Sequence, residues 1–182
     1  MATAALIAVG ILMLLMFVMF SVLVDLFRDV RQIRDALGIL DRPLIIDIGS
    51  VTGTRPSSYG LPRQLDDERF ALLLFLSDRC ATCRVLAASL GGTLPAGLWI
   101  IVEAATSQAA AEFIEMYRMT LSLGSERIYV DPAGAIAGRL GLNTTPVGYR
   151  IENGVFKDAG TVPSMRYLAT ILPTPSEAPI GI

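Results

Sequence analysis

Residues 70–90 read FALLLFLSDRCATCRVLAASL, and this stretch decides the fold. Its first part, Phe70–Ser77, is an apolar run of strand length, which is typical of a central strand buried on both faces of a sheet. A buried helix is the alternative, but the run is short for one. Residues 84–90 are rich in Ala and Leu and stop at Gly91-Gly92, which predicts a helix. A strand, a tight turn and a helix are therefore expected in succession.

The motif CATC, residues 80–83, falls in the expected turn between strand and helix. Unpaired backbone N–H groups and the helix dipole at this position stabilise a thiolate on Cys80, and Arg79 and Arg84 add positive charge. The spacing places both sulfurs on one helical turn. We therefore expect Cys80 to be the nucleophile and Cys83, facing back into the domain, to be the resolving thiol of a Cys80–Cys83 disulfide.

The composition restricts what this pair can do. The chain has 182 residues, of which 53% are hydrophobic, and a formal net charge of −2, so it can bury a core. It contains no His and only two Cys, which excludes His-dependent catalysis, ordinary haem ligation and unaided iron–sulfur ligation. Half a zinc site is the alternative for a CxxC, but no other Cys or His exists to complete it. We expect redox chemistry by the pair, with no metal and no other cofactor.

The cationic residues do not predict a nucleic-acid partner. Of the 15 Lys and Arg residues only Lys157 is a Lys, so the rest are Arg. They are scattered along the chain, with no run that would follow a phosphate backbone.

The N-terminus predicts a membrane anchor. No charged side chain occurs from Met1 to Val24, and 21 residues, 4–24, are apolar enough to cross a hydrocarbon layer of about 30 Å. A cleaved signal peptide is the alternative, but it would need a basic start and a small-residue cleavage site, whereas the apolar stretch runs directly into Asp25. We assign residues 1–24 to a transmembrane helix.

Residues 25–42 are expected to continue as an amphipathic juxtamembrane helix. Apolar residues recur there at alternating spacings of four and three, namely at Leu26, Val30, Ile33, Leu37 and Leu40. This heptad pattern is typical of a dimer or partner contact, and equally of a stalk that lies against its own domain or the membrane surface. Pro43 ends the helix, and residues 43–69 are expected to be a linker with a short strand at 44–48.

The rest of the chain predicts alternating strands and helices. Strands are expected at 98–102, 127–130, 147–151 and 155–158, and helices at 107–121, 133–140 and 163–172. The last two strands flank Asn153-Gly154, which is a strong hairpin signal. Parallel strand–helix units followed by a hairpin predict an α/β domain over residues 70–172, with a mixed sheet and helices on both faces. The Pro-rich residues 173–182 are expected to be a flexible tail.

These residues resemble the thioredoxin-like superfamily, and within it the membrane-anchored extracytoplasmic thiol-disulfide oxidoreductases such as the TlpA-like proteins. The resemblance rests on residues 70–90, on YVDPAGAIAGRLGLNTTPVGYRIENG and on the closing helix. It implies a thioredoxin-like fold in which a cis proline, Pro146, faces the disulfide, and in which the backbone of Thr145 pairs with a substrate strand. Arg79 and Thr82 complete the candidate substrate-binding set.

Two departures from the family pattern narrow the expected role. Asp78-Arg79 replaces the Trp that precedes the pair in thioredoxins, and the buried acid that assists proton transfer falls on Leu74. Exchange with one dedicated partner therefore fits better than general reduction. The anchor followed by VRQIRDALGIL also resembles the accessory thioredoxin of methylamine utilisation, which implies a role in maturing a disulfide-rich periplasmic dehydrogenase.

The orientation in the membrane has opposing indications. Positive-inside counting of Arg28, Arg31 and Arg34 favours a cytoplasmic domain. The resemblance implies the oxidising side instead, where a disulfide persists. We expect a single-pass protein of the cell membrane with an extracytoplasmic domain.

The leading functional hypothesis is an enzyme, a tethered thiol-disulfide oxidoreductase that acts on a cysteine-containing partner protein during maturation of an extracytoplasmic or respiratory enzyme. The alternative is a structural or assembly subunit of a larger membrane complex, in which the thioredoxin-like fold is a docking module. Peroxidase chemistry is a weaker third hypothesis, because it needs an exposed thiolate in a different setting.

Overall fold

The computed structural model describes residues 2–36, 43–90, 94–117 and 125–172. The chain divides into two compact units, Met1–Arg42 and Pro43–Ile182. Several expected features lie outside the described residues: Leu37, Leu40, the Gly91-Gly92 helix stop, Leu121 and the tail at 173–182.

The first unit consists of one continuous helix, α1 (Ala2–Ala36), within the described residues. Its segment Gly10–Asp29 has a mean hydropathy of 2.5 and is long and apolar enough to cross a membrane, and none of it is buried in the protein. Large apolar side chains such as Met13 and Phe17 are exposed on it. The helix passes residue 24 without a break, so the expected anchor and the start of the juxtamembrane helix form one element.

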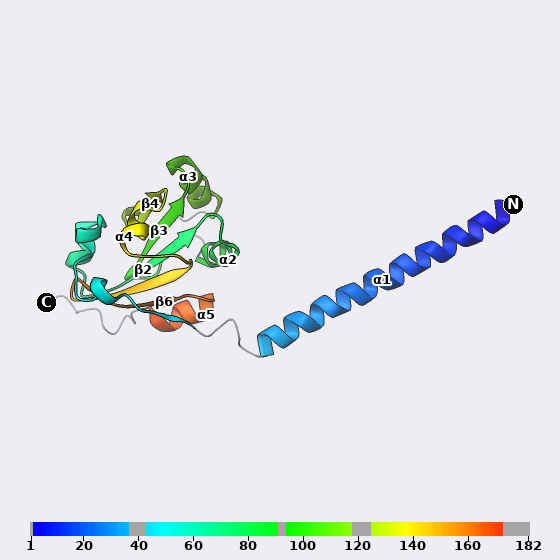
Figure 1. Ribbon diagram of the computed structural model, residues 1–182, viewed down its shortest axis with the longest axis horizontal. Coiled ribbons are helices and arrows are strands. Elements are labelled where there is room, and N and C mark those ends of the chain that lie inside the picture. Colours follow the sequence, from blue (N-terminus) through cyan, green and yellow to red (C-terminus); the bar gives the residue numbers. More distant parts are fainter. Residues whose placement is uncertain (1, 37–42, 91–93, 118–124, 173–182) are drawn as a thin grey trace. The chain divides into compact units, whose positions relative to one another are not determined.

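The second unit is built on a mixed sheet with the strand order β1-β6-β5-β2-β3-β4 (Figure 1). The strands are β1 (Ile45–Ile46), β2 (Phe70–Ser77), β3 (Leu98–Ala104), β4 (Ile128–Pro132), β5 (Val147–Glu152) and β6 (Val155–Thr161). β2, β3 and β4 are parallel, whereas β5, β6 and β1 pair antiparallel. The helices are α2 (Ala81–Leu90), α3 (Ser107–Met116), α4 (Ala135–Arg139) and α5 (Met165–Ile171).

The central strand β2 supplies both faces of the sheet, because successive side chains of a strand point to opposite sides. Leu72, Leu74 and Leu76 pack with Cys83 and with buried residues of α2, α3 and α5, and we call this side the cysteine face. Leu73 and Phe75 pack on the other side with buried residues of α4, and we call it the opposite face. The predicted burial of this strand on both sides is confirmed.

The thioredoxin-like fold expected from the sequence is also confirmed. β2, α2 and β3 form a parallel strand–helix–strand unit, and the β5–β6 hairpin and α5 complete a mixed sheet with helices on both faces. Asn153 and Gly154 have φ angles of 52° and 73°, as a tight hairpin turn requires. A Cβ atom at Gly154 would lie 1.9 Å from the carbonyl oxygen of Asp66, so only glycine fits there.

Residues 43–69 form part of this domain. They contain β1 and three short 3-10 helices, η1 (Gly49–Val51), η2 (Pro56–Tyr59) and η3 (Arg63–Asp66). Val51, Leu61 and Leu65 are buried on the opposite face. The sequence indicated a linker there because these apolar residues stand singly among Gly, Pro and Ser and follow neither a helical nor a strand period.

Candidate active site

Both cysteines lie where β2 ends and α2 begins, at the carboxyl edge of the parallel strands. The Cys80 N–H donates to the Ser77 carbonyl at 3.2 Å, which closes the turn after the strand. The Cys80 carbonyl in turn accepts from the Arg84 N–H at 3.2 Å, which opens the helix. Cys80 therefore occupies the N-cap position of α2, and the helix includes Cys83 in its first turn.

The sulfur of Cys80 is half-buried and lies between two backbone groups. It accepts the N–H of Cys83 at 3.2 Å and donates to the carbonyl of Thr145 at 3.4 Å. The Thr145–Pro146 peptide bond is cis, so the placement of a cis proline at Pro146 is confirmed. Residues that are 65 positions apart in the chain thus meet at one sulfur atom.

Cys83 differs from Cys80 in its surroundings. Its side chain has an exposed fraction of 0% and packs on the cysteine face. Burial, and after it the side-chain hydrogen bond with Cys80, raises the pKa of the Cys83 thiol to about 12. Both residues are free thiols in this structure, so the site is described in its reduced form. One accessible and one protected sulfur is the arrangement that a nucleophile and a resolving thiol require.

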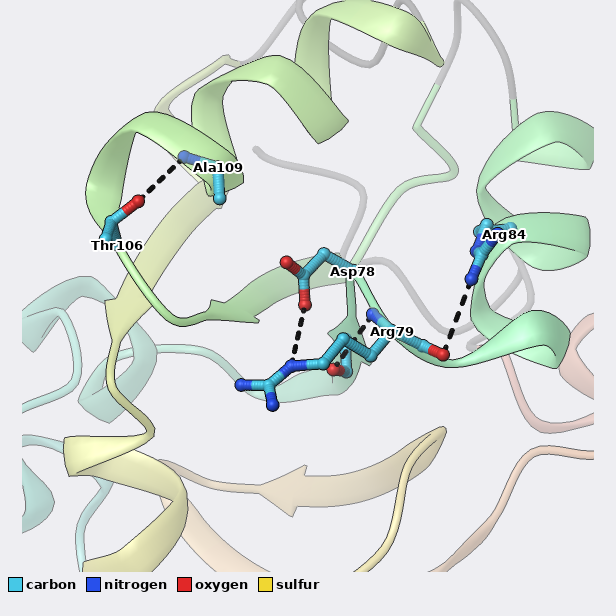
Figure 2. Close-up of polar contacts among 6 residues, drawn as sticks. Asp78, Arg79, Arg84, Thr106 and Ala109 are labelled. Atoms are coloured by element: carbon cyan, nitrogen blue, oxygen red, sulfur yellow. Dashed lines mark hydrogen bonds and ion pairs between the residues drawn. The ribbon is translucent and has the colours of Figure 1, made fainter.

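Charged side chains surround this turn (Figure 2). Arg79 is 76% exposed, and its Nε lies 3.8 Å from Oδ1 of Asp78. That oxygen is buried and accepts no hydrogen bond from the residues that the structure describes. The Arg79 N–H donates to Oγ of Ser77 at 3.4 Å, and the guanidinium of Arg84 donates to the Arg79 carbonyl at 3.5 Å. The turn is therefore stabilised mainly by hydrogen bonds among residues 77–84.

The structure brings together Cys80, Cys83, Thr145 and Pro146 from the predicted set. Arg79 flanks this group, and Thr82 is exposed on the first turn of α2. The substrate-binding roles of these residues stay predictions. The position that the resemblance assigns to a buried acid holds Leu74, which is fully buried among apolar residues of the cysteine face.

Sequence reasoning missed Ser77 and gave Asp78 no role in the turn. Ser77 supplies two acceptors, its carbonyl to Cys80 and its hydroxyl to Arg79. The sequence did contain a signal for this role. A serine at the end of a strand often accepts, through its hydroxyl, the backbone N–H two residues later in the following turn.

The described residues form no metal-binding cluster at the cysteines. Within the described ranges, no group of three or more Cys, His, Asp or Glu side chains is placed to hold a metal ion. A cavity of about 610 Å³ lies elsewhere, lined by residues that include Phe70, Arg150, Tyr167 and Ile171. That cavity includes neither cysteine in its lining.

No protein-family model matches this chain, and no curated protein matches it. Among solved structures it is similar to a secreted disulfide oxidoreductase of Mycobacterium tuberculosis described as homologous to E. coli DsbE, with 21% identity over 59% of this chain and 80% of that chain, and a TM-score of 0.40. A putative protein disulfide isomerase from Bacteroides thetaiotaomicron shares 14% identity over 56% of this chain and 68% of that chain, with a TM-score of 0.42. StoA from Bacillus subtilis shares 16% identity over 52% of this chain and 75% of that chain, with a TM-score of 0.36. With identities this low, function is inferred from the geometry of the site.

Proposed function

We propose that the protein is a thiol-disulfide oxidoreductase, an enzyme whose redox group is its own Cys80–Cys83 pair. The observation that carries this proposal is the position of the Cys80 sulfur. It is half-buried at the start of α2, faces the carbonyl before a cis proline, and has the buried thiol of Cys83 one helical turn away. Such a sulfur can meet a partner disulfide while its resolving thiol stays protected.

The exchange proceeds in two balanced steps. The Cys80 thiolate attacks one sulfur of the partner disulfide, so a mixed disulfide forms, the partner bond breaks, and the leaving thiolate takes a proton. Cys83 then loses its proton and attacks the Cys80 sulfur, which forms the Cys80–Cys83 disulfide and releases the partner as a dithiol. Two electrons pass from the protein to the partner, and the reverse sequence oxidises the partner.

The partner in this proposal is one dedicated protein met near a membrane. The exposed apolar segment Gly10–Asp29 supports a membrane tether, because no part of it is buried within the protein. A tether restricts the search for a partner and raises its effective concentration. We place the domain on the extracytoplasmic side, where it would serve maturation of a disulfide-containing enzyme, as the likeness to the methylamine-utilisation accessory thioredoxin suggests.

Trapping the mixed disulfide tests the activity. Cys83→Ser leaves Cys80 free to attack but removes the thiol that resolves the intermediate. Incubated with a synthetic peptide that carries one internal disulfide, this variant is expected to form an adduct of one peptide per chain, released by dithiothreitol. The matched variant Cys80→Ser is expected to form none. No adduct with Cys83→Ser, in a chain whose fold is intact, would reject the oxidoreductase.

A membrane-impermeant maleimide tests the location. Cells that express the full chain are reduced mildly and labelled before and after permeabilisation. Labelling of Cys80 in intact cells supports the extracytoplasmic domain, whereas labelling only after permeabilisation places it in the cytoplasm. Labelling only after denaturation would favour the second candidate, a docking module of a membrane complex. The heptad pattern that begins at Leu26 supports this candidate.

A further inference from the structure

Two arginines flank the nucleophile of the proposed reaction. Arg79 directly precedes Cys80 and is 76% exposed. Arg84 is exposed four residues after Cys80, a spacing that places it on the same side of α2. The backbone N–H of Arg84 bonds the Cys80 carbonyl, and its guanidinium bonds the Arg79 carbonyl, so both side chains start from one turn (Figure 2).

Helix stability does not explain these charges. The N-terminus of a helix carries partial positive charge, so a cation in the first turn is unfavourable for the helix. Arg84 is the fourth residue of α2 and Arg79 lies just before the helix. An acidic residue would stabilise this end of the helix, but the first turn of α2 contains none. The placement therefore points to a role outside the helix itself.

The acidic side chains near Cys80 do not neutralise the positive charge of Arg79 and Arg84. Asp78 pairs with Arg79 over a distance of 3.8 Å between Oδ1 and Nε, and no other acidic side chain among the described residues forms an ion pair with Arg79. Arg84 has no ion pair with any residue that the structure describes. Glu103, at the end of the neighbouring strand β3, directs its carboxylate to Gly134, where an added Cβ would lie 3.3 Å from Oε1.

We infer, building on the proposed function, that the partner carries an acidic segment beside its reactive cysteine. Carboxylates of that segment pair with Arg79 and Arg84 while the mixed disulfide exists. Guanidinium groups suit this task because they bind carboxylates through two parallel hydrogen bonds and stay charged at every physiological pH. The two arginines are thus specificity residues that align the partner disulfide with the Cys80 sulfur.

The test compares three cyclic disulfide peptides that differ only at the two positions beside one cysteine, which hold Glu, Gln or Lys. Because a nearby charge also alters the intrinsic reactivity of a disulfide towards any thiolate, each rate is divided by the rate of the same peptide with dithiothreitol, which carries no arginine. The full-length reduced chain is expected to reduce the Glu peptide about tenfold faster than the Lys peptide at an ionic strength of about 0.01 M. The ratio is expected to fall towards one at about 1 M salt.

Charge reversal at the arginines supplies the control. Arg79→Glu combined with Arg84→Glu is expected to invert the preference in favour of the Lys peptide. The matched pair Arg55→Glu and Arg63→Glu changes the same number of charges at exposed sites of the segment that packs on the opposite face, and is expected to keep the wild-type ratio. Circular dichroism of each variant confirms that the fold is retained.

The outcomes separate this inference from the function on which it rests. Equal corrected rates for the three peptides, or a ratio that the arginine reversal leaves unchanged, would overturn the acidic partner and leave the oxidoreductase intact. No reaction with any peptide would overturn the oxidoreductase itself. Inversion by the arginine pair but not by the control pair is the result that the inference requires.

Discussion

Two turns at the same edge of the sheet lead from a parallel strand into a helix, and they are built differently. Near the end of β4, the carboxylate of Asp131 is fully buried and accepts two backbone N–H groups of α4, from Ile136 at 2.8 Å and from Ala137 at 2.9 Å. Between β2 and α2, the corresponding acceptor is the sulfur of Cys80, which takes the single N–H of Cys83 at 3.2 Å. Sulfur is a weak acceptor, so the second turn has the weaker cap.

The other helices of the domain follow the pattern of α4 rather than that of α2. Oγ1 of Thr106 caps α3 by accepting the N–H of Ala109 at 3.1 Å, as Figure 2 shows. Oγ of Ser164 caps α5 by accepting the N–H of Tyr167 at 3.2 Å. Side-chain oxygens, which are good hydrogen-bond acceptors, therefore cap three helices of the domain. The fourth helix, α2, begins at the proposed active site and has only the weaker sulfur acceptor of Cys80. This is the compromise typical of functional sites.

The largest predicted effect concerns pH and the thiol beneath the α2 turn. Because burial raises the pKa of Cys83 to about 12, its reactive thiolate is scarce at neutral pH. Resolution of the mixed disulfide in the wild-type chain is expected to accelerate about tenfold per pH unit between about pH 7 and 10. Quenched-flow measurement of adduct decay checks this. A rate that levels off below about pH 9 would show that Cys83 is not protected.

The second prediction concerns the turn between β4 and α4, which Asp131 caps. Asp131→Ala leaves two N–H groups of α4 without their acceptor, so the free energy of unfolding is expected to fall by about 3 kcal/mol. Urea unfolding of the full chain in detergent, followed by circular dichroism, measures the loss. Asp131→Asn keeps one side-chain oxygen and is expected to lose less. Equal stability of Asp131→Ala and the wild type would remove the proposed contrast between the two turns.

The third prediction concerns an ordinary cap outside the cysteine site. Thr106→Ala is expected to lower the free energy of unfolding by about 1 kcal/mol, because the N–H of Ala109 loses its side-chain acceptor. The rate of peptide reduction is expected to stay at the wild-type value, and both are measured on one preparation. Thr106→Ser retains the hydroxyl and serves as the control. A loss of exchange rate with retained stability would extend the site to α3.

The smallest predicted effect is a gain in stability on replacing Cys80, and its direction tests whether the sulfur is a weak cap. Cys80→Ser replaces a weak N-cap acceptor with a good one, so the reduced chain is expected to gain about 0.5 kcal/mol of stability while losing all exchange. Unfolding in urea beside the reduced wild type measures the gain, and Cys83→Ser is the control in which a buried position changes instead. A clear loss of stability in Cys80→Ser would show that the sulfur contributes more to the turn than an oxygen does.

The strand, turn and helix around the cysteines were predictable from sequence because local patterns encode them. An apolar run of strand length, a CxxC and an Ala-rich helix stand in direct succession, and Asn153-Gly154 marks the hairpin by its backbone preference. The approach of Thr145 to Cys80 is not local, and only the family resemblance implied it. The same holds for the cis bond before Pro146, because most X-Pro bonds are trans.

Other parts of the site and fold had no sequence signal of their own. Asp131 caps a helix that starts several residues later, and Asp-Pro in this chain indicates only a turn. The buried residues of η1 to η3 are too sparse for a periodic pattern, so their place on the opposite face emerges only from the tertiary structure. Asp78, whose buried Oδ1 accepts no hydrogen bond from the described residues, was identified only as a departure from the thioredoxin pattern.

Competitive alkylation tests the central claim, that Cys80 is the accessible nucleophile and Cys83 the protected resolving thiol, most directly. The reduced full chain is treated with limiting iodoacetamide near pH 7, and the peptide CATCR, residues 80–84, is fragmented by mass spectrometry to locate the label. Labelling of Cys80 first, with Cys83 modified only after unfolding, is the predicted result. Preferential labelling of Cys83, or no labelling of either cysteine until the chain is unfolded, would contradict it.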